Sequence, residues 1–143
     1  MNEVLKLHYD VDGENFTSAG DASVNVKKKL RQMGFSPDVI RRVSIAMYEG
    51  EINMVIHACG GEVDVFIYPE EIDIILADKG PGIADVELAM KEGYSTAPDN
   101  IRSLGFGAGM GLPNMKRYSD EMKIESKVGA GTKITMKVKV AGE

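Results

Sequence analysis

The sequence predicts an α+β fold, a two-layer sandwich in which a mostly antiparallel or mixed sheet carries helices on one face. Apolar, β-branched runs come in two close pairs, 62–68 with 72–77 and 121–127 with 132–140, and a short turn sequence separates the members of each pair. A long helical stretch precedes them, and helices packed on one face of such a sheet are its natural cover. With 143 residues, we expect a single domain over 1–143.

The first part of the chain predicts a strand followed by two helices. Residues 3–9 alternate loosely and indicate a strand, and residues 18–33 have the composition of a helix with a glycine just after its end. A Ser-Pro-Asp run starts the second helix, because serine can cap, proline suits the first turn and aspartate favours the helix dipole there. We expect this helix to run over 36–58 and to stop at the glycines 60–61.

The second part predicts two hairpins around a long connection. We expect a short helix over 84–91, a long loop over 92–108 and a helix over 110–118. A long loop without apolar periodicity in a compact domain is typical of a lid or a binding loop. Lysine and threonine alternate with apolar residues over 132–140, so one face of this strand is expected to be buried and the other wet.

Composition excludes several classes of function. The net charge is −5, which argues against nucleic-acid binding, because that needs a basic face. No run approaches the ~18 apolar residues of a membrane helix, and the N-terminal stretch is not a secretory signal, so we expect a cytoplasmic protein without membrane contact. The one cysteine, Cys59, allows neither an internal disulfide nor a cysteine-based zinc cluster.

A stripe of polar side chains runs along the predicted long helix. Glu49, Asn53 and His57 are spaced at i, i+4 and i+8, which places them within roughly 80° of arc on one face. Ile40, Val43, Met47 and Met54 fall on a separate, core-facing stripe. Taken alone, the polar stripe is most simply a solvated face. The functional interpretation makes Glu49 a base and Asn53 an oxygen ligand for a hard cation such as Mg²⁺.

Two glycine-containing segments suggest a nucleotide. Asp78-x-Gly80-x-Gly82-Ile83 follows an apolar strand, where it is either a plain turn or a carboxylate placed to accept a hydrogen bond from a base amino group. The alternating glycines of 105–112 come just before a helix, so they are either a hinge or a set of free N–H groups suited to phosphate. They match neither a P-loop nor a Rossmann fingerprint.

The order of these segments resembles the GHKL ATPases, whose fold is the Bergerat fold. The N box looks like Glu49-x-x-x-Asn53, and the first glycine box looks like Asp78-x-Gly80-x-Gly82. Further boxes look like 105–112 and Gly129-x-Gly131-Thr132, so the resemblance covers nearly the whole chain from residue 36 onward. Four ordered boxes make chance agreement unusual.

Length indicates a branch of this superfamily, and so does the segment Gly93-Tyr94-Ser95-Thr96-Ala97-Pro98 of the expected lid, which looks like the aromatic-Ser/Thr-Thr segment of the anti-sigma factor kinases. The chain is too short for the transducer domain of gyrase-like members, and it resembles the bacterial anti-sigma factor serine/threonine kinases and stress-pathway switch kinases. That resemblance implies ATP and Mg²⁺ as cofactors and an anti-anti-sigma protein of the STAS fold, a sigma factor or both as partners. It also implies a possible homodimer.

The resemblance implies a role for each matching residue. Glu49 would be the catalytic base for a serine or threonine hydroxyl, Asn53 would bind Mg²⁺, and Asp78 would hold adenine with Thr132 nearby. The remaining nucleotide contacts would shape the adenine pocket, close the lid or wrap the phosphates: Gly80, Gly82, Ile83, Thr96, Gly105, Gly107, Gly109, Met110, Gly111 and Leu112.

Two further functions stay open on the sequence alone. One is a non-catalytic module in which ATP shapes a surface that captures a sigma factor or another regulator. The other is a nucleotide-binding protein of a metabolic pathway. Glu49 favours the enzyme, because a serine hydroxyl needs a proton acceptor before it can attack and a binding module does not.

Overall fold

The computed structural model describes residues 5–12, 20–57, 60–78, 111–127, 129 and 131–140. Within them lie five strands and three helices. In chain order they are β1 (Leu5–Asp12), α1 (Asp21–Gln32), α2 (Pro37–His57), β2 (Gly60–Ile67), β3 (Glu71–Ala77), α5 (Gly111–Tyr118), β4 (Glu121–Lys127) and β5 (Gly131–Lys139). None of the helices in this described part is long and apolar enough to cross a membrane.

The strands form one sheet in the order β1-β2-β3-β5-β4, and every neighbouring pair is antiparallel. The final hairpin is inserted so that β5, and not β4, pairs with β3. At the centre of the sheet, Ile74 lies opposite Val65 on one side and opposite Met136 on the other. The predicted α+β class is therefore confirmed, and the sheet is antiparallel in the part of the chain that the structure describes.

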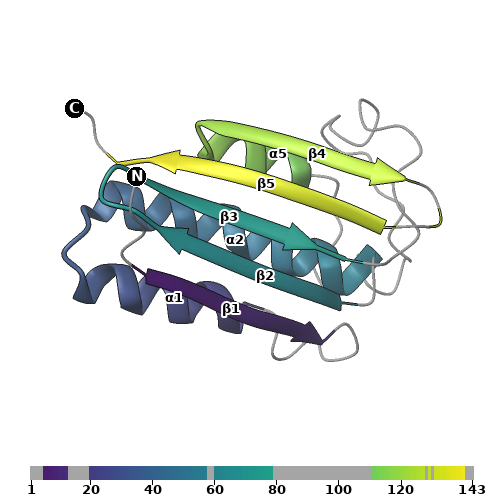
Figure 1. Ribbon diagram of the computed structural model, residues 1–143, viewed down its shortest axis with the longest axis horizontal. Helices are drawn as coiled ribbons and strands as arrows, with labels where there is room; N and C mark the ends of the chain where they lie inside the picture. The colour runs from purple at the N-terminus through teal and green to yellow at the C-terminus, as the bar shows by residue number, and fades with distance from the viewer. Residues whose placement is uncertain are drawn as a thin grey trace.

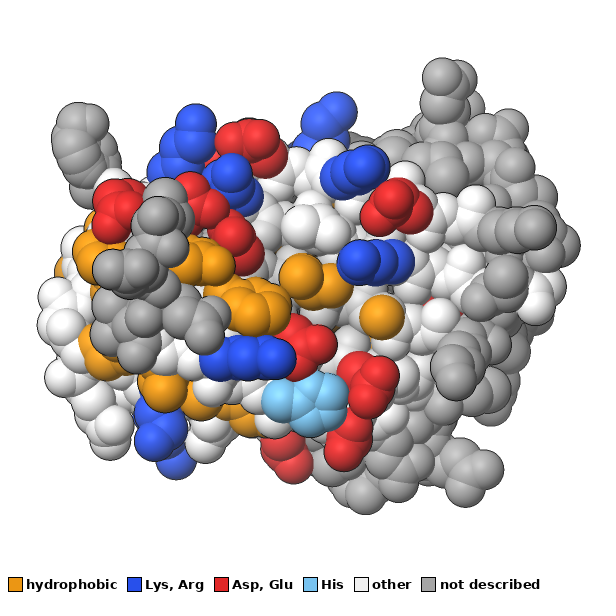
Figure 2. Space-filling view, in the orientation of Figure 1, with side chains coloured by type: hydrophobic (Ala, Val, Ile, Leu, Met, Phe, Trp, Pro, Cys, Tyr) orange, Lys and Arg blue, Asp and Glu red, His pale blue; other side chains and the backbone are white. Residues whose placement is uncertain are grey.

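All three described helices cover the same face of the sheet (Figure 1). The core lies between the two layers and is formed by alternate residues of β2, β3 and β5 together with one side of each helix. The other face of the sheet carries lysine and carboxylate side chains around a few apolar ones (Figure 2). The predicted alternation of β5 is confirmed, because Ile134, Met136 and Val138 are buried while Lys133 and Lys139 are exposed.

Helix α2 begins where the Ser-Pro-Asp run predicts. The Oγ atom of Ser36 accepts a hydrogen bond from the N–H of Val39 at 3.3 Å, which satisfies one of the open donors of the first turn. The predicted core-facing stripe is confirmed as well, because its four side chains are at most 8% exposed: Ile40, Val43, Met47 and Met54.

The glycines after α2 do more than end the helix. Gly60 and Gly61 were expected as a stop signal, but they are the first residues of β2. A Cβ atom at Gly61 would overlap the carbonyl oxygen of Ala77 and the end of the Met54 side chain. Glycine therefore allows β2, β3 and α2 to approach closely at this point. The predicted short helix over 84–91 and the long loop over 92–108 lie outside the described residues.

Candidate functional site

The half of α2 that carries the predicted site residues lies over the end of β3. A Cβ atom at Gly50 would overlap the Leu76 side chain, so the helix axis runs very close to the sheet here. Glu49 precedes this contact point and Asn53 follows it by one turn, while Asp78 comes directly after β3. Helix α2 and strand β3 thus bring the two halves of the predicted site to the same end of the molecule (Figure 1).

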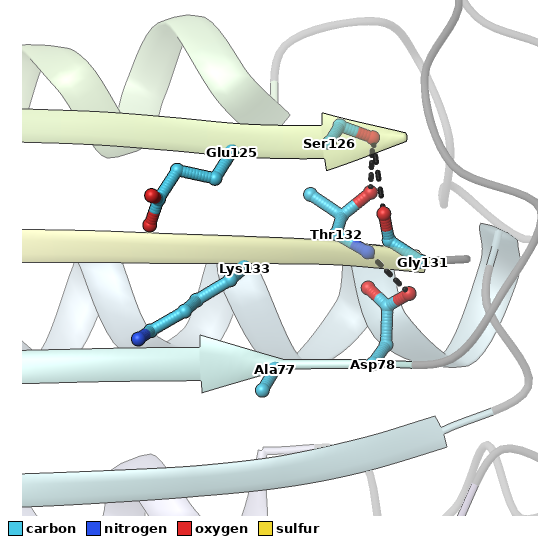
Figure 3. A pocket seen from close by; sticks show the side chains of 7 residues that line it. All are labelled: Ala77, Asp78, Glu125, Ser126, Gly131, Thr132 and Lys133. Carbon is cyan, nitrogen blue, oxygen red and sulfur yellow. Dashed lines mark hydrogen bonds between the residues drawn. The ribbon is translucent and has the colours of Figure 1, made fainter. Parts of the chain in front are cut away.

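Asp78 and Thr132 meet at this end because β3 and β5 are antiparallel neighbours. The Oδ1 atom of Asp78 accepts a hydrogen bond from the Thr132 N–H at 3.2 Å, and the Asp78 N–H donates to the Thr132 carbonyl oxygen at 2.9 Å. The Oγ1 atom of Thr132 lies 2.8 Å from the Oγ atom of Ser126 on β4 (Figure 3). The structure therefore places the Asp78 carboxylate on the main chain of Thr132, whose hydroxyl pairs with Ser126, and adenine recognition by Asp78 and Thr132 stays a prediction.

A shallow, open hollow of about 330 Å³ lies beside these strand ends (Figure 3). None of its lining residues lies on α2, so the hollow does not itself join the Asp78 end to Glu49 and Asn53. Its lining combines the strand ends with two cross-strand partners from the open sheet face: Ala77, Asp78, Glu125, Ser126, Gly131, Thr132 and Lys133.

Glu49 has the environment of a proton acceptor. Its side chain is half-buried on α2, and this burial raises the pKa of its carboxyl above the usual glutamate value. A hydrogen bond with the side chain of Asn114, on α5, acts in the opposite direction and lowers the pKa. A half-buried carboxylate with a raised pKa is suited to general base catalysis near neutral pH.

Asn53 and the start of α5 complete what the structure describes of the predicted site. Asn53 is half-buried one turn after Glu49, and its amide oxygen is a ligand type that Mg²⁺ accepts. Gly111 is the first residue of α5, and Leu112 is 6% exposed and packs in the core. Any phosphate contact from Leu112 would therefore come from its main chain, at the N-terminal end of a helix.

Eight predicted site residues lie outside the described part of the chain: Gly80, Gly82, Ile83, Thr96, Gly105, Gly107, Gly109 and Met110. The side chain of His57 and the whole of Cys59 lie outside it as well. The roles of all these residues stay predictions.

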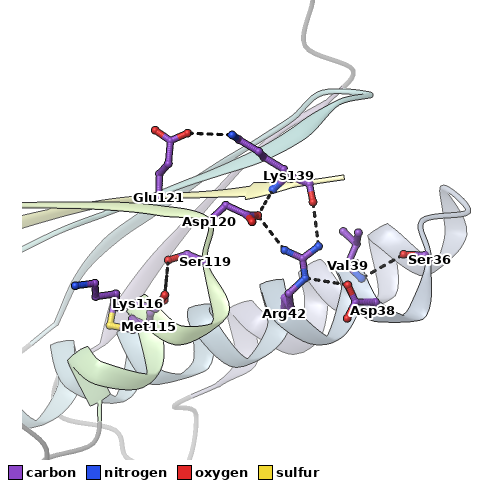
Figure 4. Close-up of polar contacts among 10 residues, drawn as sticks. All are labelled: Ser36, Asp38, Val39, Arg42, Met115, Lys116, Ser119, Asp120, Glu121 and Lys139. Carbon is purple, nitrogen blue, oxygen red and sulfur yellow. Dashed lines mark hydrogen bonds and ion pairs between the residues drawn. The ribbon is translucent and has the colours of Figure 1, made fainter. Parts of the chain in front are cut away.

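Helix α5 is held at its other end by a group of charged contacts around Arg42 (Figure 4). The Arg42 guanidinium donates to Asp38 at 3.0 Å, to Asp120 at 2.9 Å and to the carbonyl oxygen of Lys139 at 3.0 Å. Asp120 also accepts the Lys139 N–H at 2.6 Å. Asp120 lies two residues after the end of α5. These contacts therefore tie the end of α5 to the first turn of α2 and to the end of β5.

Sequence reasoning missed Glu51. Its side chain is 2% exposed and accepts hydrogen bonds from the N–H groups of Gly20 at 2.9 Å, Ala22 at 3.2 Å and Ser23 at 2.7 Å. It therefore caps the first turn of α1 from the neighbouring helix. A signal was present, since Glu51 interrupts the apolar stripe of α2 between Met47 and Met54.

Comparison with known proteins identifies the architecture. The family model of the histidine kinase-like ATPase domain matches residues 18–138. An anti-sigma F factor of Clostridium acetobutylicum is 36% identical over 142 residues, covering 96% of this chain and 92% of that protein. The serine/threonine-protein kinase RsbT of Bacillus subtilis is 33% identical over 114 residues, covering 77% of each chain.

Solved structures show the same fold. The RsbU and RsbW domains of a Mycobacterium tuberculosis protein align with a TM-score of 0.64 at 16% identity, covering 98% of this chain and 34% of that longer one. A mycobacterial sensor histidine kinase, MprB, aligns with a TM-score of 0.56 at 18% identity, covering 97% of this chain and 100% of that one. The matching family is described as an ATPase domain, and this description indicates ATP as the ligand of the family. This chain therefore belongs to the histidine kinase-like ATPase family, as its four boxes predict.

Proposed function

We propose that this protein binds Mg-ATP in the cytoplasm and transfers the γ-phosphoryl group to a serine or threonine of an anti-anti-sigma protein of the STAS fold. The observation that carries this proposal is the half-buried Glu49 carboxyl, whose pKa is raised and which lies on α2 at the Asp78 end of the sheet. The relatives named anti-sigma F factor and serine/threonine-protein kinase support it.

The predicted site residues that the structure describes each have a role in this reaction. Glu49 accepts the proton of the attacking hydroxyl as the new oxygen–phosphorus bond forms and the bond from the γ-phosphorus to the β–γ bridging oxygen breaks, with ADP as the leaving group. The Asp78 carboxylate accepts from the adenine amino group, and Thr132 lies within reach of the same base. Asn53 would hold Mg²⁺, whose charge compensates that of the phosphates.

The second candidate is a binding module in which ATP controls the capture of a sigma factor. It is favoured by the relatives named anti-sigma F factor, and it needs the Asp78 end of the site but not Glu49. A homodimer is compatible with both candidates and stays a prediction.

Two variants separate these candidates. Glu49→Gln keeps the size of the side chain but removes the proton acceptor, so it should keep the rise in melting temperature caused by Mg-ATP and lose phosphate transfer. Asp78→Asn should lose the rise itself. Transfer is measured from γ-labelled ATP to each purified STAS-domain protein of the same genome, with Lys123→Ala on the open sheet face as the matched control.

The outcomes are distinct. Labelled partner with the wild-type protein but not with Glu49→Gln supports the kinase. Equal labelling with both proteins means that Glu49 is not the base. No labelling together with ATP-dependent capture of a sigma factor supports the binding module. No rise in melting temperature at millimolar ATP removes both candidates.

A further inference from the structure

The open face of the sheet carries a histidine among carboxylates (Figure 2). In the register of β1 and β2, His8 lies opposite Asp64, and Asp10 lies opposite Glu62. Alternate residues of a strand point to the same face, so these four side chains form a square on the face that the helices leave uncovered. None of the four is among the residues that the sequence assigns to the nucleotide.

Asp64 determines which nitrogen of the His8 ring is free. The Nδ1 atom of His8 lies 2.6 Å from Oδ1 of Asp64. An ionised carboxylate only accepts hydrogen bonds, so Nδ1 carries the proton and Nε2 is left to bind another group. Metal-binding histidines are oriented in the same way, because their second ring nitrogen usually donates its proton to a carboxylate or a carbonyl group.

Two further carboxylates face the Nε2 atom of His8. Oδ1 of Asp10 lies 3.2 Å from it, and Oε1 of Glu62 lies 3.7 Å from it. The ligand atoms of these three residues all lie within 4.8 Å of one another. At metal–ligand distances of about 2.1 Å, two ligands of a tetrahedral ion are about 3.4 Å apart, so a cation fits among these atoms with little movement of the side chains.

The charges around this point favour a cation as well. Asp10 and Glu62 are like charges directly opposite each other on neighbouring strands, an arrangement that costs a sheet stability. In the part of the chain that the structure describes, the His8 ring is the one basic group in contact with either of them. With Asp64, three carboxylates surround one imidazole, and the square stays negatively charged even when the ring is protonated.

We propose that His8, Asp10 and Glu62 bind a divalent transition-metal ion such as Zn²⁺, with Asp64 as the positioning residue that orients the imidazole. An imidazole nitrogen and two carboxylate oxygens form a donor set that Zn²⁺ accepts, whereas Mg²⁺ and Ca²⁺ prefer oxygen ligands. The three ligand residues are exposed, so the ion can enter from solvent and keep water at its remaining coordination positions.

The location of the site defines what the ion would do. Strand β1 is at the edge of the sheet and β2 is its one neighbour in the described strand order. His8 and Asp10 lie on β1 and Glu62 lies on β2, so a shared ion would fasten the edge strand to the rest of the sheet. Binding to the folded chain alone raises the melting temperature, so occupancy can be followed by thermal unfolding.

Calorimetric titration of the chelator-treated full chain with ZnCl₂, in the absence of nucleotide, tests the site. We expect one Zn²⁺ to bind through these residues, and Asp10→Asn, Glu62→Gln and Asp64→Ala each to weaken the Kd by at least about tenfold. The matched control is Glu70→Gln, which removes an exposed carboxylate from the turn between β2 and β3 and should keep the Kd of the wild type. Zn²⁺ should raise the melting temperature of the wild type and of Glu70→Gln but not of Glu62→Gln.

Two results overturn the site. One is equal Zn²⁺ affinity in the wild type, His8→Ala and Glu62→Gln, because the ion then binds elsewhere on the chain. The other comes from ¹⁵N NMR of the imidazole rings: the chain has two histidines, so His8→Ala identifies the signals of His8, and its Nε2 signal must move as Zn²⁺ is added. An Nε2 signal that does not respond to Zn²⁺ overturns the site without relying on any variant of the ligands.

Two further outcomes address the parts of the proposal. Unchanged affinity in Asp64→Ala overturns the positioning role of Asp64. Mg²⁺ that binds to these residues as tightly as Zn²⁺ overturns the class of metal. None of these measurements involves ATP or phosphate transfer, so the site can fail or stand independently of the proposed kinase function.

Discussion

The buried carboxylate of Glu51 offers a sharp test of what joins α1 to α2. Glu51→Ala would leave the N–H groups of Gly20, Ala22 and Ser23 without their acceptor at a buried helix start. At about 1 kcal/mol for each lost hydrogen bond, the free energy of unfolding should fall by about 3 kcal/mol. In a domain of this size that corresponds to a fall in melting temperature of roughly 10 °C.

A second substitution refines this estimate. Burial raises the pKa of Glu51 because it outweighs the three N–H donors, so the site tolerates loss of charge better than loss of the acceptor. Glu51→Gln keeps one acceptor oxygen and the shape of the side chain, and we expect it to cost about half as much as Glu51→Ala. Urea unfolding followed by circular dichroism measures both variants, and hydrogen exchange should show earlier opening of the first turn of α1.

The matched control is Glu49→Gln, two residues away on the same helix, where no backbone donor meets the carboxylate in the described contacts. We expect it to change the unfolding free energy by less than about 1 kcal/mol. If Glu51→Ala unfolds within about 2 °C of the wild type, the three hydrogen bonds do not hold the helices together and the argument fails.

Three further predictions follow from the sheet and its contact with α2. Burial, assisted by the neighbouring Glu71 carboxyl, raises the pKa of Asp73 from 3.8 to about 7, so this group favours the folded state at low pH and loses that contribution as the pH rises through about 7. Asp73→Asn should therefore raise the melting temperature at about pH 8 and leave it unchanged at about pH 4, and the opposite order would contradict the raised value. The hydrogen bonds that the His8 ring donates to the carboxylates of Asp64 and Asp10 raise the pKa of His8 above 6.5. The contribution of His8 to stability is therefore fully present below 6.5 and is lost as the pH rises through the folded pKa, so His8→Ala should lower the melting temperature in acid and not in alkali. Gly50→Ala should cost about 1–3 kcal/mol in urea unfolding, because the added methyl overlaps a buried side chain of β3, and a neutral result would show that the helix can shift there freely.

Local patterns predicted the elements of this fold well. Alternation along 132–140 assigned the buried face of β5, and the cap at Ser36 located the start of α2. Alternation says which face a residue occupies but not which strand lies beside it, so the insertion of β5 between β3 and β4 could not be predicted. For the same reason, the two glycines after α2 gave a stop signal but not the close approach of three elements at Gly61.

The candidate site shows the same difference between features that local patterns predict and features that depend on contacts between distant segments. Glu49 and Asn53 could be placed on one helix face because their spacing is local, and Asp78 could be paired with Thr132 through the family resemblance. The packing of α5 beside this part of α2 could not be found, because it depends on how two helices distant in sequence come together, as Gly50 and Met115 do. Glu51 was detectable as a charged interruption of an apolar stripe, although its three donors lie about thirty residues away.

The direction of the strands also determines how the molecule can be attached to a surface or a dye. Leu5, where β1 begins, lies opposite Ile67, and Lys139, where β5 ends, lies opposite Glu71, so both are at the turn between β2 and β3. Asp78 is at the far end of β3. A biotin tag or a fluorophore attached at the start of β1 or at the end of β5 would therefore sit at the opposite end of the sheet from Asp78, and immobilised protein should keep the Asp78 end accessible.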